Sequence, residues 1–141
     1  MTIKEIQEEI VEEFAFFEDW MERYEHLIEL GKSLPLIEDQ YKLDENLIKG
    51  CQSKVWLHSD LTDNAMKFTA DSDAILTKGI VALLLRVFNQ QTPSDILEAN
   101  TSFIDDIGLK EHLSPTRANG LVSMLKQIKM DALAHQAKSS N

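Results

Sequence analysis

Cysteine is almost absent from this sequence, since Cys51 is the only one among 141 residues. A single cysteine excludes a disulfide within the chain, a dithiol redox cycle, and a cysteine-rich zinc or iron–sulfur site built by one chain alone. Any covalent chemistry at this thiol must therefore involve a sulfur or acyl group that another molecule brings.

Positive charge is also scarce. The chain has 14 Lys and Arg residues against 24 Asp and Glu residues, which gives a formal net charge of -10. Nucleic acids and anionic membranes select basic surfaces, so we expect neither of them as a main partner. An acidic surface suits docking on a basic protein instead.

Long apolar runs and targeting segments are lacking as well. The longest apolar run, Ile80 to Leu85, is far too short to span a bilayer. The N-terminal segment, residues 1–5, is charged and amphipathic rather than signal-like. We therefore expect a cytoplasmic protein without a membrane partner, in a reducing compartment where a thiol stays free.

What is present suits one domain over residues 1–141, because 43% of the residues are hydrophobic and can form a core. The first part of the chain has the spacing of a helical region with one apolar and one acidic face. Asp19 and Glu22 fit a capping box, which predicts a break near Glu18 and a second helix that ends at Gly31. The expected core face consists of Ile3, Ile6, Ile10, Phe14, Phe17, Met21, Tyr24 and Ile28.

The middle of the chain predicts a small antiparallel sheet. Residues 53–59 have an apolar strand centre, and residues 66–70 alternate between apolar and polar side chains. Asp63-Asn64 between them is a turn signal, so the two segments form a hairpin. A third strand that ends at Ile48 is expected to pair with the first hairpin strand, which places Cys51 on the connecting loop.

The second half of the chain is expected to be helical. Ser72 as N-cap, with Asp73 in the first turn, predicts a buried central helix that continues to Phe88. Gly79 inside this helix indicates a close backbone approach, because glycine disfavours a helix interior. Thr92-Pro93 and Ser114-Pro115 begin further helices. The last of them is expected to bury one face, made of Leu121, Val122, Leu125, Ile128 and Leu133.

The surroundings of Cys51 favour a reactive thiol. Lys49 and Lys54 flank it, and a nearby cation favours the thiolate, which is the form that attacks. The alternative is an inert, partly buried thiol, since free cysteines often only pack. The residues that complete the loop are polar or flexible: Gly50, Gln52 and Ser53.

His58 offers another interpretation, in which it serves Cys51 as the general base of a thiol hydrolase. It lies on the expected strand, several residues beyond the loop, which separates the two side chains. The remaining histidines have no metal-ligand spacing, so no metal site is predicted. These are His26, His112 and His135.

Arg117 is an unusual residue for its position, because a cation in the first turn of a helix opposes the helix dipole. It either pairs with an acidic neighbour on the surface or meets a partner or the thiol loop. Asn119-Gly120 follows it, and both residues are poor helix formers. Their small size would let the helix approach another backbone closely.

The cysteine loop and three other stretches resemble the SufE family of sulfur-acceptor proteins. They agree with the family in order and spacing over nearly the whole chain, and Lys54 stands where the family often has glutamine. The stretches are Leu27–Pro35, Gly50–Trp56, Asp71–Ala74 with Lys78–Gly79, and Leu113–Leu121.

The resemblance implies an α+β domain. In the implied fold, a three-stranded antiparallel sheet is flanked by N-terminal helices, a buried central helix and C-terminal helices. This arrangement is similar to the NifU-type iron–sulfur scaffold fold. The resemblance also implies that Cys51 accepts sulfane sulfur as a persulfide. In this family the cysteine loop is sheltered against apolar residues and swings out to react, so the resemblance implies the same for Cys51 and places Asp73 and Arg117 near the partner-docking surface.

The implied partner is a SufS-type cysteine desulfurase, which uses pyridoxal phosphate, whereas this chain binds no cofactor of its own. The chain would act as a covalent sulfur acceptor and as an activator of that enzyme, not as an enzyme itself. The sulfur would then pass to an iron–sulfur scaffold. From the residues alone, three alternatives stay open: a Cys51/His58 hydrolase, a scaffold that assembles a cluster itself, and an adaptor that never uses its thiol.

Overall fold

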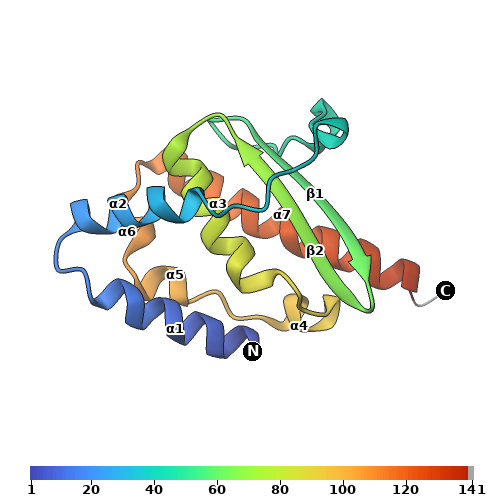
Figure 1. The fold of residues 1–141 in the computed structure, drawn as a ribbon, viewed down its shortest axis with the longest axis horizontal. Coiled ribbons are helices and arrows are strands. Elements are labelled where there is room, and N and C mark those ends of the chain that lie inside the picture. Colours follow the sequence, from blue (N-terminus) through green and yellow to red (C-terminus); the bar gives the residue numbers. More distant parts are fainter. Residues whose placement is uncertain (140–141) are drawn as a thin grey trace.

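A β-hairpin packs on one side of a group of helices in the computed structural model, which describes residues 1–139 (Figure 1). The order of elements confirms the expected α+β class. It is α1 (Ile3–Ala15), α2 (Trp20–Gly31), the short 3-10 turns η1 (Asp39–Tyr41) and η2 (Asp44–Asn46), β1 (Val55–Thr62), β2 (Ala65–Ser72), α3 (Ile75–Phe88), α4 (Pro93–Glu98), α5 (Phe103–Asp106), α6 (Leu109–His112) and α7 (Pro115–Ser139).

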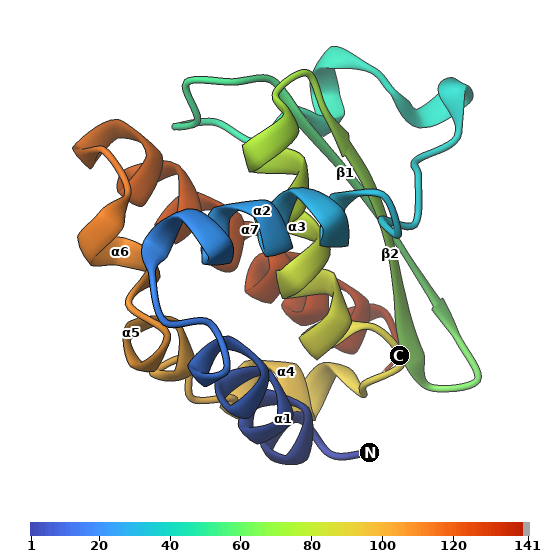
Figure 2. The same ribbon diagram turned by 60° about the vertical axis from the view of Figure 1, so that its left-hand side comes forward.

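Helix α3 is the buried centre of the molecule, as its apolar sequence predicts. It lies between α2 and the hairpin, and α7 runs behind it (Figures 1 and 2). Burying one of its large apolar side chains contributes about 1.5–3 kcal/mol. Gly79 lies where α2 crosses, since a Cβ there would collide with the Leu27 carbonyl oxygen. The close backbone approach expected at Gly79 is therefore confirmed.

The hairpin is antiparallel, and its register runs from Val55 opposite Ser72 to Thr62 opposite Ala65. Asp63 and Asn64 both have positive φ, 53° and 64°, as a tight two-residue hairpin turn requires. The predicted turn is thus confirmed. One face of the hairpin enters the core through Val55, Leu57, Met66, Phe68 and Ala70.

The prediction of a three-stranded sheet is wrong, because the described residues form a sheet of two strands. The expected third strand is reduced to a single bridge, in which Leu47 pairs with Trp56 and the Ile48 amide donates to the Val55 carbonyl at 2.8 Å. The 3-10 turn η2 ends just before this bridge, and Gly50 turns the chain away just after it with a φ of 92°. Too few extended residues remain between them for a ladder.

The helix starts agree in part with the sequence signals. Asp19 caps α2 by accepting from the Glu22 amide at 2.8 Å, and Thr92 caps α4. Ser72 is not the N-cap of α3, since it ends β2 and Ala74 takes the cap position. Strand pairing holds the chain extended up to Ser72, so Asp73 lies before the helix instead of in its first turn. Within residues 1–139, no helix is both long and apolar enough to cross a membrane.

Candidate functional site

Cys51 lies on the loop between the Leu47 bridge and β1, where it packs against the first turns of α7. Its side chain is half-buried, and its thiol donates to the Gly120 carbonyl oxygen with an S···O distance of 3.6 Å. A Cβ added at Gly120 would lie 3.5 Å from the Cys51 Sγ and 3.7 Å from its Cα. A methyl group at position 120 would make only van der Waals contact with Cys51, so the loop packs directly on this turn of α7 and a side chain larger than alanine would crowd the thiol.

Gly50 of the loop contacts α7 at Ser123, one helical turn beyond Gly120. A Cβ at Gly50 would lie 2.5 Å from the Ser123 Oγ, and the backbone there has a φ of 92°, which favours glycine. The cysteine loop thus rests on a Gly120-x-x-Ser123 surface. Sequence reasoning found Gly120 but not Ser123; the signal available was the spacing of three, which puts both small residues on one helix face.

Both ends of the cysteine loop are held by hydrogen bonds to neighbouring segments. At the C-terminal end, the Asp73 carboxylate accepts from the Lys54 amide at 3.0 Å. The Asp73 amide also donates to the Lys54 carbonyl at 3.3 Å. The Ile48–Val55 bond closes the N-terminal end, so residues 49–53 are the segment between the two held ends. Asp73, expected at a docking surface, is exposed and joins the loop to the start of α3.

The resting thiol is not activated in the way that its flanking lysines suggested. Burial raises the pKa of the Cys51 thiol, because the thiolate would lose hydration. Lys49 and Lys54 are both exposed, and neither forms an ion pair within residues 1–139. The protonated thiol is consequently the form at rest, which agrees with its donating a hydrogen bond to Gly120.

Arg117 lies on α7 one turn before Gly120, on the side chain row that leads to Cys51. Its backbone amide donates to the Ser114 Oγ at 3.3 Å, which caps the helix start. The side chain is exposed, and the guanidinium has no ion pair in the described part of the chain. The sequence allowed Arg117 to pair with an acidic neighbour on the surface. The structure has no such pair among the described residues.

Gln52 and Ser53 complete the loop. Gln52 is exposed and Ser53 is half-buried. Asp73 and Arg117, which lie at the starts of α3 and α7, are exposed as well. The sequence-predicted residues Gly50, Cys51, Asp73 and Arg117 are thus brought to one end of the fold, where the starts of α3 and α7 meet the loop.

His58 is not brought to this site. Its ring stacks on Tyr41 with a centroid separation of 3.7 Å, and its Nε2 lies 3.2 Å from an Asp60 carboxylate oxygen. The neighbouring Ser59 donates to Asp131 of α7. Asp131 lies about 16 Å beyond Gly120 along the helix, at a rise of about 1.5 Å per residue. A Cys51–His58 catalytic pair is therefore inconsistent with the fold.

No group of three or more His, Cys, Asp and Glu side chains within residues 1–139 is arranged to hold a metal ion. The arrangement at Cys51 has one nucleophilic sulfur, backbone groups and solvent-facing polar side chains. It can therefore form a covalent bond through Sγ, with the rest of any reaction supplied from outside the chain.

Comparison with known proteins agrees with these features. A family model described as SufE, Fe–S metabolism associated domain, matches residues 8–132. An uncharacterized SufE-like protein of Rhizobium meliloti (strain 1021) is 40% identical over 130 residues, which cover 89% of this chain and 93% of that protein. Another, of a Synechocystis strain, is 40% identical over 131 residues, covering 93% and 82% of the two chains.

The fold also has a counterpart among solved structures. The solution structure of a hypothetical protein from Thermus thermophilus superposes with a TM-score of 0.79. The match covers 94% of this chain and 96% of that chain, at 20% sequence identity. At this identity, the likeness shows that the two chains share a fold.

Proposed function

Because the chain belongs to the SufE family of Fe–S metabolism proteins, we propose that it is a sulfur carrier that receives sulfane sulfur as a persulfide on Cys51. The donor is the persulfide of a cysteine desulfurase whose own chemistry uses pyridoxal phosphate. The sulfur then passes to an iron–sulfur scaffold in the cytoplasm.

One observation carries this proposal: the chain's single thiol lies half-buried on a short loop that is tied down at both ends and rests on Gly120. A carrier must protect its sulfur between reactions, because an exposed thiolate or persulfide oxidises readily. It must also release the sulfur to a second protein. A short loop between two fixed ends meets both needs.

The transfer step balances without an added oxidant or reductant. The Cys51 thiolate attacks the terminal sulfur of the desulfurase persulfide, a new S–S bond forms at Cys51, and the S–S bond of the donor breaks. The donor cysteine leaves as a thiolate and takes up the proton that Cys51 lost. Clearing the donor persulfide lets the desulfurase turn over again, which is how this chain would stimulate it.

The Cys51 thiol must lose its proton before this step. Burial opposes ionisation in the resting loop, and the Gly120 carbonyl accepts only from the protonated form. When the loop leaves α7, the sulfur gains hydration and the flanking lysines act on a thiolate in water. Loop opening and thiol activation are therefore one event, which confines reactivity to the open loop.

The alternative functions are less compatible with the geometry. A thiol hydrolase needs a base within hydrogen-bond reach of the sulfur, and His58 is held by Tyr41 and Asp60 elsewhere on the sheet. A scaffold that assembles its own cluster needs several thiolate ligands, and the chain has one cysteine. An adaptor that ignores its thiol does not explain the loop's shelter.

The test is a sulfur-transfer assay read by intact mass. The chain is incubated with a SufS-type desulfurase, pyridoxal phosphate and cysteine, and it should gain one sulfur atom that a reducing agent removes. Cys51→Ser should gain none and should not stimulate the desulfurase. If the wild-type mass stays unchanged while the desulfurase forms its own persulfide, or if Cys51→Ser stimulates equally, the proposal is wrong.

A further inference from the structure

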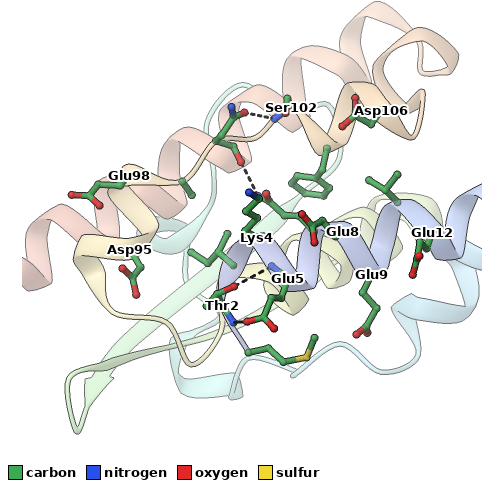
Figure 3. Close-up of a pocket in the computed structure, with 17 residues that line it drawn as sticks. Thr2, Lys4, Glu5, Glu8, Glu9, Glu12, Asp95, Glu98, Ser102 and Asp106 are labelled. Atoms are coloured by element: carbon green, nitrogen blue, oxygen red, sulfur yellow. Dashed lines mark hydrogen bonds between the residues drawn. The ribbon is translucent and has the colours of Figure 1, made fainter.

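A second surface, unrelated to the cysteine loop, lies between α1 and the α4–α5 segment. It is a groove of about 1230 Å³, open to solvent and drawn in Figure 3. One wall is residues 1–12, and the other is formed by residues 95–106. The Gln7 Nε2 donates to the Asn100 carbonyl at 2.7 Å, so a hydrogen bond joins the two walls.

The floor of this groove is apolar. Ile3 and Phe103 lie at the junction with the core and are 8% and 2% exposed. Val11 and Ala99 also line the groove and are half-buried. These two side chains are thus left partly open to water between two helical walls. An apolar strip in a concave surface stabilises a partner by removing this area from water.

The walls are strongly acidic. Seven acidic side chains and one basic side chain, Lys4, line the groove, so its net charge is -6 of the -10 that the whole sequence carries. The acidic residues come from both walls (Figure 3) and are Glu5, Glu8, Glu9, Glu12, Asp95, Glu98 and Asp106.

Most of this charge is not neutralised within the protein. Glu9 pairs with Arg86 at 2.6 Å, and the Glu5 carboxylate accepts from the Thr2 amide at the cap of α1. The other five carboxylates have no ion pair within residues 1–139; they are Glu8, Glu12, Asp95, Glu98 and Asp106. Apart from Lys4, the side chains that line the groove bring no cation to offset this charge, so cations of a partner would relieve the mutual repulsion.

The shape of the groove indicates which kind of cationic partner fits it. The groove is larger and more open than a small-molecule pocket. The α1 part of the wall, from Ile3 to Glu12, extends over about 14 Å, or two and a half turns of a helix. An apolar floor between two acidic walls is complementary to an amphipathic helix with leucine-like residues on one face and Lys or Arg on both flanks. Nucleic acid and anionic lipid would be repelled by the same walls.

We propose that this groove is a docking site for a basic amphipathic helix of a partner protein. The cysteine loop and α1 lie at opposite edges of the molecule in both ribbon views (Figures 1 and 2). A partner in the groove therefore leaves Cys51 open to a second protein. The proposal does not depend on sulfur chemistry at Cys51.

The test uses a synthetic peptide of about 14 residues, with Leu and Lys arranged in an amphipathic helical repeat. Its binding is measured by fluorescence anisotropy, and the site is located by amide chemical shifts. We expect saturable binding, with the largest shifts at Val11, Ala99 and Phe103. A peptide of the same composition with its leucines spread around the helix should bind more weakly.

Two charge-matched triple variants separate docking from general attraction. The groove variant Glu8→Gln, Glu12→Gln and Glu98→Gln should weaken binding about tenfold. The control variant Glu18→Gln, Glu25→Gln and Glu111→Gln removes the same charge from exposed residues outside the groove and should leave affinity near wild type.

Three results would overturn the proposal. The first is an equal loss in both triple variants, which would show attraction to net charge alone. The second is a set of shifted amides outside the groove. The third is self-association of the free protein that the groove variant abolishes, because the occupant would then be a second copy of this chain.

Discussion

The Asp73 carboxylate accepts the backbone amide of Lys54 at 3.0 Å and thereby ties the cysteine loop to the start of α3. The two residues are separated by 19 positions and by the whole hairpin. The bond holds the C-terminal end of the loop at Lys54, three residues after Cys51, so we expect the loop to bend at Lys54 when Cys51 leaves α7. Asp73 is exposed and contacts the loop through Lys54, so we expect it to position the thiol loop.

Replacing Asp73 should loosen the loop. Asp73→Ala removes the acceptor of the Lys54 amide and should lower stability by about 1 kcal/mol. It should also raise the rate at which a disulfide reagent labels Cys51 several-fold, because the loop leaves Gly120 more often. Asp73→Asn keeps an acceptor oxygen and serves as the control. An Asp73→Ala variant labelled at the wild-type rate would contradict a holding role.

Gly120 should respond differently to a small and to a larger side chain. Gly120→Ala places its Cβ at van der Waals distance from the Cys51 Sγ and removes a helix-interior glycine, so stability should rise by up to about 1 kcal/mol. Gly120→Val adds branches towards the sulfur and should displace the thiol. Labelling of Cys51 should then accelerate in the Val variant only. Equal labelling of both variants would show that the sulfur does not rest on this position.

The reactivity of Cys51 should depend on pH in a defined direction. Since burial raises the thiol pKa, alkylation of the folded protein should reach half-maximum at a higher pH than alkylation of the unfolded chain. The same shift makes the folded state bind its proton more tightly. This contribution to stability is present below the unfolded-state pKa and is lost as pH rises through the folded-state value.

Asp73→Ala provides a check on this pH dependence. Its alkylation midpoint should move towards that of the unfolded chain, because the freed thiol gains hydration. The measurement is the rate of alkylation against pH for wild type, Asp73→Ala and the urea-unfolded protein. Coinciding midpoints for the folded and unfolded wild type would refute the burial argument.

Arg117 should matter to a partner and not to the fold. Its guanidinium has no ion pair in the described residues, so Arg117→Ala should change stability by less than about 0.5 kcal/mol. In the desulfurase assay, it should raise the KM for this chain several-fold. Lys126→Ala, another exposed cation on α7, is the matched control. If the two variants raise KM alike, then the effect is one of general charge.

Local sequence signals predicted the local features well. The Asp63-Asn64 turn, the Asp19 cap, the Thr92-Pro93 start and the apolar central helix are all present. Each depends on residues within one or two turns of each other. The family match over residues 8–132 also agrees with the resemblance seen in the four sequence stretches.

Helix faces were predicted less well. Met21 and Ile28 are 65% and 38% exposed, whereas Leu27 is buried, because the break before Asp19 changes the direction and the phase of the helix. On α7, Val122 and Leu133 are exposed, and the buried row contains Met124 and Ala132. The neighbours that choose a buried row, such as α4 and the hairpin, are distant in sequence.

The sequence by itself determined that one thiol stands on a loop before the first hairpin strand, that no second sulfur can assist it within the chain, and that acidic residues outnumber basic ones. The tertiary structure decided the hydrogen bond and the burial of that thiol. The Gly120 carbonyl that accepts its hydrogen lies 69 residues away, and the burial that raises its pKa comes from α7. The flanking lysines, adjacent in sequence, lie at solvent-exposed positions and do not set the resting state. Desolvation depends on the atoms packed around a group, and no local pattern specifies which distant helix supplies them.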